Sequence, residues 1–429
     1  FTPRAKRVLW LFMHGGPSHM DLWDPKPDLL RYAGKPLPAS FGEVMTRRKV
    51  AKNPLLGPVK PFRPRGQSGL EISEFLPHIA QHADDLCVLR GCHGDSVNHP
   101  QSVYQINTGS ILMGKPSVGS WVAYGLGTEN QDMPAFIVMP DPRGGLKGGP
   151  PAWGNGYLPA TYQGTTLRSG TNPILNLRPS AIRTPDHQRA ISNFIQRFNK
   201  QHVADRDNDD ALMARIHAYE LAFRMQMQAP QVVDISQETS EVQELYGMDD
   251  PVTAGFGRQC LLARRLVESG VRYTLLVHGV QIGKHSWDDH GDVAGGMARH
   301  SREVDRPVAG LLADLKRRGL LEETLVVWAS EMGRTPFKNG GMTDKPGRDH
   351  NSYGLVMWMA GGNVKGGATA GETDEFGLRA TGDPIPIRDV HATILDLMGL
   401  EDERLRYLHA GRLRRLTDTG GTVIDRIIS

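Results

Sequence analysis

The chain has 429 residues and a nearly balanced charge, with 50 Lys and Arg residues against 47 Asp and Glu residues. A formal net charge of +3 argues against a nucleic-acid-binding surface, which would show as a strong basic excess. No apolar run reaches the roughly 20 residues of a membrane span, and the three cysteines are too few for a disulfide framework.

The first half of the chain alternates short apolar strands with long loops. Strands are expected at residues 8–13, 86–89 and 135–139, where most segments are apolar on both faces, as in parallel strands covered by helices. A helix is predicted over residues 101–107, because Pro100 suits a first helical position. Two stretches rich in Gly and Pro are interpreted as insertions, near residues 31–69 and 141–179.

The second half repeats the alternation. Helical apolar stripes run through residues 212–223 and 304–315, and a third helix over residues 392–398 is expected to stop at Gly399. The expected strands are residues 273–277, 325–329 and 355–359. The pattern predicts one α/β domain over residues 1–429, with a doubly wound, mostly parallel sheet and helices on both faces.

Polar side chains cluster beside the ends of these strands. Ligands of open α/β sheets bind at the carboxyl ends of the strands, so we expect the clusters to converge at one edge. They contain His14, His19 and Asp21 after the first strand, His93 and Asp95 after the second, Asp288 and His290 after residues 273–277, Glu331 and Arg334 after residues 325–329, and Arg348, Asp349 and His350 before residues 355–359.

Histidine nitrogen together with carboxylate oxygen indicates a metal site. That donor set suits zinc, manganese or iron, whereas an all-oxygen set would suit calcium or magnesium. We expect one or two divalent ions, with zinc or manganese favoured and calcium as the alternative. The expected ligands are His14, His19, Asp21, Asp288, His290, Glu331, Asp349 and His350.

The segment Asn98-His99-Pro100 indicates an anion site, because a helix that starts at Pro100 directs free N–H groups and its dipole towards His99. A helix cap without catalytic function is an equally good interpretation of His99 at this stage. Asn98, His99 and Arg334 are the candidate catalytic residues. The candidate substrate-binding residues are His93, Asp95 and Arg348. The basic run of residues 47–49 is interpreted as a solvated loop.

Six stretches, in this order, carry a resemblance that covers nearly the whole chain: LFMHGGPSHMDLWDPKP, NHPQSVYQINTG, SWDDHGD, TLVVWASEMGRTP, GRDHNSYGLVMWMAGG and DVHATILDLMGL. The chain resembles the bacterial domain of unknown function 1501 family, which is grouped with the alkaline phosphatase and sulfatase superfamily. EMGRTP followed by GRDH is the most specific part of the match.

The resemblance implies roles for individual residues. His14 stands at or near the superfamily's first metal-binding Asp, Asp288 with His290 looks like a metal pair, and His350 looks like the last metal-binding His. Glu331 takes the place of an Asp, and Met332 replaces the neighbouring His. Thr108-Gly109 places His99 at the position of the superfamily's nucleophile.

The departures from the superfamily concern the nucleophile. No Ser, Thr or Cys stands at position 99, and residues 99–103 lack the Cys or Ser followed by x-Pro-x-Arg that formylglycine sulfatases need. An ordinary formylglycine sulfatase is therefore not expected. His99 either attacks directly, or it binds a metal whose water attacks.

The expected function is a metal-dependent hydrolase of sulfate or phosphate esters, with a small-molecule or carbohydrate ester as substrate. Two alternatives remain: a non-catalytic metal- or ligand-binding protein, and a phosphosugar mutase-like enzyme, which would normally keep a Ser nucleophile. Members of the resembled family often carry an export signal. Since the sequence begins with Phe1, we expect a periplasmic or extracellular location after removal of a leader.

Overall fold

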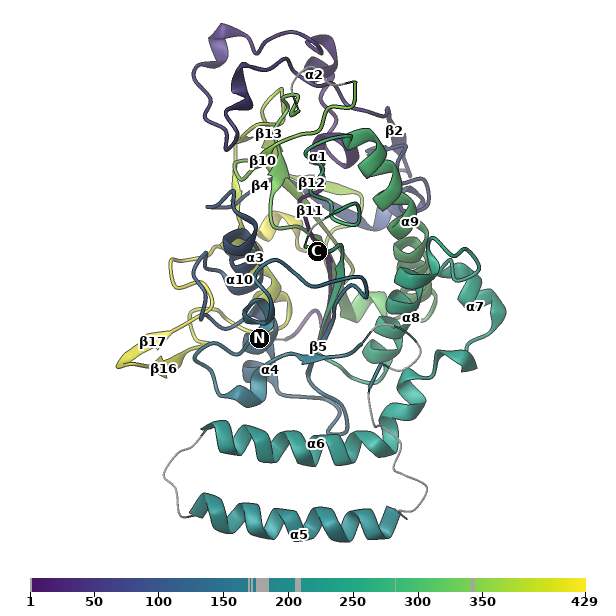
Figure 1. Cartoon of the computed structure of the whole chain (residues 1–429), viewed down its shortest axis with the longest axis vertical. Coiled ribbons are helices and arrows are strands. Elements are labelled where there is room, and N and C mark those ends of the chain that lie inside the picture. The colour runs from purple at the N-terminus through teal and green to yellow at the C-terminus, as the bar shows by residue number, and fades with distance from the viewer. Residues whose placement is uncertain are drawn as a thin grey trace.

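The computed structural model describes residues 2–168, 170, 173–174, 185–204, 210–281, 283–340 and 344–429. A nine-stranded sheet forms its centre (Figure 1). The strand order is β12-β4-β11-β8-β1-β7-β5-β6, with β15 paired to β4. The strands are β1 (Arg7–Met13), β4 (Leu86–His93), β5 (Phe136–Met139), β6 (Thr165–Thr166), β7 (Tyr273–His278), β8 (Thr324–Ala329), β11 (Leu355–Ala360), β12 (Ala368–Ala370) and β15 (Ile385–Pro386).

All six predicted strands are present, and the predicted α/β fold is confirmed. The sheet is mixed because β11 runs antiparallel to both of its neighbours, β4 and β8. The start of β11 therefore lies at the same edge as the carboxyl ends of β1, β7 and β8. This reversal brings the residues before β11 to the edge where the other clusters end.

Apolar side chains on both faces of the strands create two cores. In β1, Leu9 and Leu11 face one core, while Trp10 and Phe12 face the other. Helices α8 and α9 cover the first face, and α3, α4 and α10 cover the second (Figure 1). The helices are α1 (His19–Leu22), α2 (Pro27–Arg31), α3 (His99–Thr108), α4 (Val118–Leu126), α5 (Pro185–Ala204), α6 (Asp210–Val233), α7 (Ser240–Leu245), α8 (Ala254–Glu268), α9 (Val293–Arg317) and α10 (Ile387–Leu397).

The helix boundaries follow the predicted signals with one exception. Gly109 and Gly399 come at the ends of α3 and α10 with φ of 73° and 78°, the left-handed conformation that glycine adopts without strain. Asn98, not His99, is the N-cap of α3, and His99 is its first residue. The expectation that His99 caps this helix is therefore wrong, because Pro100 is the second helical residue and not the first.

The insertion of residues 31–69 contains only short elements, among them β2 (Phe62–Arg65), which forms a hairpin with β3 (Leu70–Ser73) just after the insertion. Part of the insertion of residues 141–179 lies outside the described residues. Among the described residues, no helix is both long and apolar enough to cross a membrane. The organisation of residues 1–429 as one domain stays a prediction.

Candidate metal-binding active site

His14 and Glu331 meet at the ends of the two central parallel strands. His14 follows β1, Glu331 follows β8 by one residue, and both are buried. The Gly15 N–H donates to Glu331 Oε1 at 2.9 Å and to Oε2 at 3.1 Å. Gly15 has φ of 123°, and a Cβ here would lie 2.6 Å from the Trp287 nitrogen, so the turn needs glycine. The backbone thus fixes the carboxylate beside the His14 ring.

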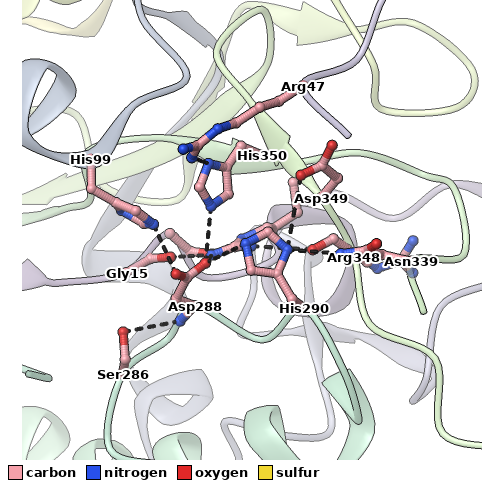
Figure 2. A network of polar contacts seen from close by, with 12 residues as sticks. Gly15, Arg47, His99, Ser286, Asp288, His290, Asn339, Arg348, Asp349 and His350 are labelled. Atoms are coloured by element: carbon pink, nitrogen blue, oxygen red, sulfur yellow. Dashed lines mark hydrogen bonds and ion pairs between the residues drawn. The ribbon is translucent and has the colours of Figure 1, made fainter. Parts of the chain in front are cut away.

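His99 enters the same space from the first turn of α3. Its Nδ1 lies 2.6 Å from Glu331 Oε1. Its Nε2 lies 3.0 Å from Asp288 Oδ2, as Figure 2 shows for the His99 and Asp288 side chains. Burial lowers the pKa of His99, but hydrogen bonds to Asp288 and Glu331 outweigh this effect and raise it. Burial would raise the pKa of Glu331, yet His14 and His99 lower it to about 2. The structure therefore favours a protonated His99 between two carboxylates.

Asp288 is the hub of the cluster. Its Oδ1 lies 2.7 Å from Arg334 Nη2, 3.0 Å from His350 Nε2 and 3.1 Å from His290 Nε2. Its Oδ2 lies 2.9 Å from Lys147 Nζ. These partners hold the pKa of Asp288 far below its usual range, although burial acts in the opposite direction. The carboxylate is consequently ionised near pH 7.

The two motifs that are most specific in the sequence pair with each other. Gly333–Arg334 forms β9 and His350–Asn351 forms β10, with His350 opposite Arg334 in an antiparallel pair. Each nitrogen of the buried Arg334 guanidinium donates within the protein: Nε to Gly16 O at 2.7 Å, Nη1 to Arg348 O at 3.1 Å and Nη2 to Asp288. Arg334 is buried and does not line the hollow, so its hydrogen bonds position the cluster.

His350, His290 and Asp349 form the outer part of the cluster. The Asp349 Oδ1 atom is buried without a hydrogen-bond partner and lies 3.8 Å from His290 Nδ1. Burial lowers the pKa of His350 to about 4, so its ring is neutral near pH 7. Neutral imidazoles beside an unpartnered carboxylate oxygen are what a metal ion requires.

Three overlapping groups of donors in this cluster have ligand atoms within 4.8 Å of one another. Two of them share His99, and two share His350. The groups are His14 with His99 and Glu331, His99 with Asp288 and His350, and His290 with Asp349 and His350. The donors are nitrogen and oxygen atoms, the set expected for zinc or manganese. Cys87, Cys92 and Cys260 are buried away from it.

An open hollow of about 620 Å³ gives access to the cluster. His99, Asp288, His290 and His350 contribute to its lining, together with Asn98 from the N-cap of α3. Cationic side chains add to it from the two insertions: Arg47, Arg48 and Lys147. The site therefore presents positive charge to whatever enters.

A comparison with known protein families gives a match over nearly the whole sequence. The chain matches the family described as "Protein of unknown function (DUF1501)" over residues 5–428. It belongs to this family. The resemblance inferred from the six sequence stretches is thereby confirmed, and a search of the curated proteins gave no match.

Several solved structures of hydrolases are similar to this chain. A PsFucS1 sulfatase from Pseudoalteromonas sp. has a TM-score of 0.40 and 14% identity, covering 93% of this chain and 69% of that one. An alkaline phosphatase from the Antarctic bacterium TAB5 has a TM-score of 0.39 and 11% identity, covering 93% and 99%. A phosphonate monoester hydrolase from Silicibacter pomeroyi has a TM-score of 0.37 and 12% identity, covering 76% and 69%. The similarity is too low to transfer residue roles.

Three of the expected site residues lie elsewhere. Asp21 and Arg348 pair with each other, Arg348 Nε donating to Asp21 Oδ2 at 2.8 Å, and both side chains are fully buried. His19 Nε2 lies 2.8 Å from Gly377 O, and its Nδ1 faces the Arg334 N–H at 3.5 Å. The polar side-chain atoms of all three residues already have partners within the protein. We therefore remove His19 and Asp21 from the expected metal ligands and Arg348 from the substrate-binding residues.

His93 and Asp95 at the end of β4 were expected to bind substrate, and the structure places them away from the hollow. Asp95 Oδ2 instead accepts a hydrogen bond of 2.5 Å from Gln105 Nε2. Conversely, Arg47 and Arg48 line the hollow, although the sequence suggested only a solvated loop, and Lys147 was not foreseen at all. Their positions depend on where the insertions fold back, which no local pattern reveals.

Proposed function

We propose that this protein is a metal-dependent hydrolase of anionic sulfate or phosphate esters, with a sulfated or phosphorylated carbohydrate as a fitting substrate. The observation that carries the proposal is a His and carboxylate cluster beneath a hollow with a cationic rim. Such a hollow attracts an anionic ester to the place where ligands for a metal ion converge. A location outside the cytoplasm is part of the proposal.

The residues present fit a divalent ion. His290, Asp349 and His350 would hold one ion, and His14 with Glu331 would offer donors to a second beside the protonated His99. His350 can donate from Nδ1 to Val97 O at 2.7 Å, which leaves its Nε2 lone pair for a metal, the usual arrangement of a ligating His. When bound, such an ion would supply Lewis acidity at the ester oxygens.

The hollow offers no ordinary oxygen or sulfur nucleophile. Its lining in the described part of the chain contains no Ser, Thr or Cys side chain. Burial raises the pKa of the Cys87 thiol to about 12, and that of Cys92 is also raised, so neither forms a thiolate readily. This composition disfavours a mutase, which needs a hydroxyl nucleophile, and supports attack by water.

His99 is suited to move a proton in that reaction. Its Nδ1 is held by Glu331, while the ring also lines the hollow near Asp288. A protonated ring held between two carboxylates can give its proton to the leaving oxygen and recover it from the attacking water. A direct attack is disfavoured because both nitrogens face carboxylates.

The test begins with purified protein that is stripped of metal and reloaded with zinc, manganese or calcium. Bound metal is measured by elemental analysis, and turnover is measured with an aryl sulfate and an aryl phosphate. We expect stoichiometric zinc or manganese and metal-dependent turnover of at least one ester. Metal binding without turnover of either class would instead support the non-catalytic alternative, and absence of metal binding would overturn the proposal.

A further inference from the structure

Arg47 differs from the other two cations of the hollow in having no carboxylate partner. Lys147 Nζ lies 2.9 Å from Asp288 Oδ2, and Arg48 Nε lies 3.9 Å from Asp349 Oδ1. Among the described residues, no acidic group lies within ion-pair distance of Arg47. Its guanidinium carries a full charge and several N–H donors towards the hollow. The charge of Arg47 is therefore available to an anion that enters the hollow.

Arg47 makes two polar contacts through its Nη1 atom. This atom lies 2.8 Å from His350 Nδ1 and 3.5 Å from Val97 O (Figure 2). His350 Nδ1 also lies 2.7 Å from Val97 O. A neutral imidazole nitrogen is either a donor or an acceptor, so Nδ1 cannot donate to Val97 and accept from Arg47 together. The two contacts belong to two different tautomers of His350.

The tautomers have opposite consequences at the other ring nitrogen. When Nδ1 accepts from Arg47, the proton is on Nε2 and points at Asp288 Oδ1, 3.0 Å away. When Nδ1 donates to Val97, the Nε2 lone pair is free for a metal, and Arg47 loses its acceptor on His350. A ligand on Nε2 therefore disconnects Arg47 from the ring.

We propose that Arg47 binds the tetrahedral oxyanion of the substrate, and that metal binding at His350 releases it for this task. The inference rests on the proposed function for the identity of the site, but it concerns binding and not turnover. A planar guanidinium can contact two oxygens of a sulfate or phosphate group at once, which a Lys ammonium cannot do with the same geometry.

The experiment compares Arg47→Gln with Lys49→Gln by calorimetric titration of the metal-loaded protein with inorganic phosphate and with inorganic sulfate. Lys49 is exposed on the same loop and does not line the hollow, so its variant removes the same charge without touching His350. We expect Arg47→Gln to weaken oxyanion binding by about tenfold or more, and Lys49→Gln to stay within about twofold of the original chain. Equal affinities for Arg47→Gln and the original chain would overturn the proposal. A lack of oxyanion binding by the original chain would do the same.

A second arm tests the linkage to metal. In titrations of the metal-free protein with zinc, Arg47→Gln should bind more tightly than the original chain, because the competing tautomer loses its stabilising contact. Lys49→Gln removes a charge on the same loop that touches neither His350 nor Asp349, and it should have the smaller effect. An equal increase in zinc affinity in both variants would show that only the lost positive charge matters. It would overturn the proposed competition between Arg47 and metal for His350. Oxyanion binding that depends on Arg47 in a protein without ester turnover would leave this inference intact and refute the proposed function alone.

Discussion

Two buried clusters of His and carboxylate lie close together in this molecule, and only one opens to solvent. The open cluster surrounds Asp288 and lines the hollow. The sealed cluster consists of His278, His300 and Glu303, and its ligand atoms also lie within 4.8 Å of one another. By donor type and spacing alone the two would be equally good metal sites.

The two clusters differ in the hydrogen bonds of His278 and Glu303 and in access to the hollow. Trp287 Nε1 donates to His278 Nδ1 at 2.9 Å, so the His278 proton is on Nε2, which faces Glu303 Oε2 at 2.8 Å. The other oxygen of Glu303 accepts from Arg143 at 2.9 Å, and Arg143 also binds Asp141. Each of these donors faces an acceptor, and none of the three cluster residues lines the hollow. The two ring nitrogens of His300 are buried without a hydrogen-bond partner, so free lone pairs are present in the sealed cluster as well. The comparison teaches that a site needs access as well as the right residues.

The largest effect is expected from breaking the support beneath the open cluster. Arg334→Gln removes donors to Asp288 and to buried backbone carbonyls, and we expect a loss of about 3–5 kcal/mol in the free energy of unfolding. Urea denaturation measures this loss. Arg334→Lys should also be destabilised, since an ammonium cannot reproduce the fork. A loss below about 1 kcal/mol, as is typical for an exposed salt bridge, would contradict the role of Arg334 as a buried support of the cluster.

The second prediction concerns turnover. His99→Ala should lower kcat for the active aryl ester at least about a hundredfold, roughly 2.7 kcal/mol in barrier, if His99 moves the proton. The matched control is His217→Ala, which changes an exposed His on α6 and should be normal. Metal content is measured on both variants. Loss of metal together with turnover would identify His99 as a ligand, whereas normal turnover would refute its role.

The third prediction is a matched pair of isosteric changes, one in each cluster. At free zinc of about one hundred times Kd, metal should stabilise the original chain by about 2.7 kcal/mol. Glu331→Gln should abolish or strongly reduce this shift, while Glu303→Gln should retain it. Thermal unfolding with and without zinc measures both variants. A lost shift in Glu303→Gln would place metal in the sealed cluster and invert the comparison.

The smallest effect is a dependence of stability on pH in the metal-free protein. The pKa of His350 is lowered to about 4 from 6.5, so the unfolded chain binds more protons between these values. Stability contributed by the neutral ring is present above pH 6.5 and is lost as the pH falls towards 4, by at most about 1.4 kcal/mol per pH unit. His350→Gln should flatten this part of the profile of unfolding free energy. An unchanged slope would contradict the assignment.

Most of the open cluster was predictable because strand ends are visible in the sequence. His14, Asp288 and Glu331 follow apolar strands, and a parallel sheet brings such ends to one edge. His350 precedes its strand, and it reaches the same edge only because β11 is reversed. The roles of these residues as ligands stay predictions.

The parts of the site that the sequence did not reveal depend on contacts between segments that are distant in the sequence. Asp21 and Arg348 carry strand-end signals as clear as those of the true cluster, but 327 positions apart they neutralise each other. Arg47 and Lys147 come from insertions without periodicity, so nothing local indicated that they face the hollow. The sealed cluster was missed because Glu303 and His300 lie inside a long amphipathic helix, where they resemble ordinary helix residues.

The strand order of the sheet has a consequence for how the chain folds as it is synthesised. The central strand β1 is made first, yet its neighbours β7 and β8 emerge about 260 and 310 residues later. Trp10 and Phe12 therefore gain their permanent neighbours only after about 310 further residues have been synthesised. Contacts between such remote segments form slowly and leave apolar strands exposed in the meantime. Because His14 and His350 are 336 residues apart in the sequence, the proposed metal site can be completed only after most of this chain has been made.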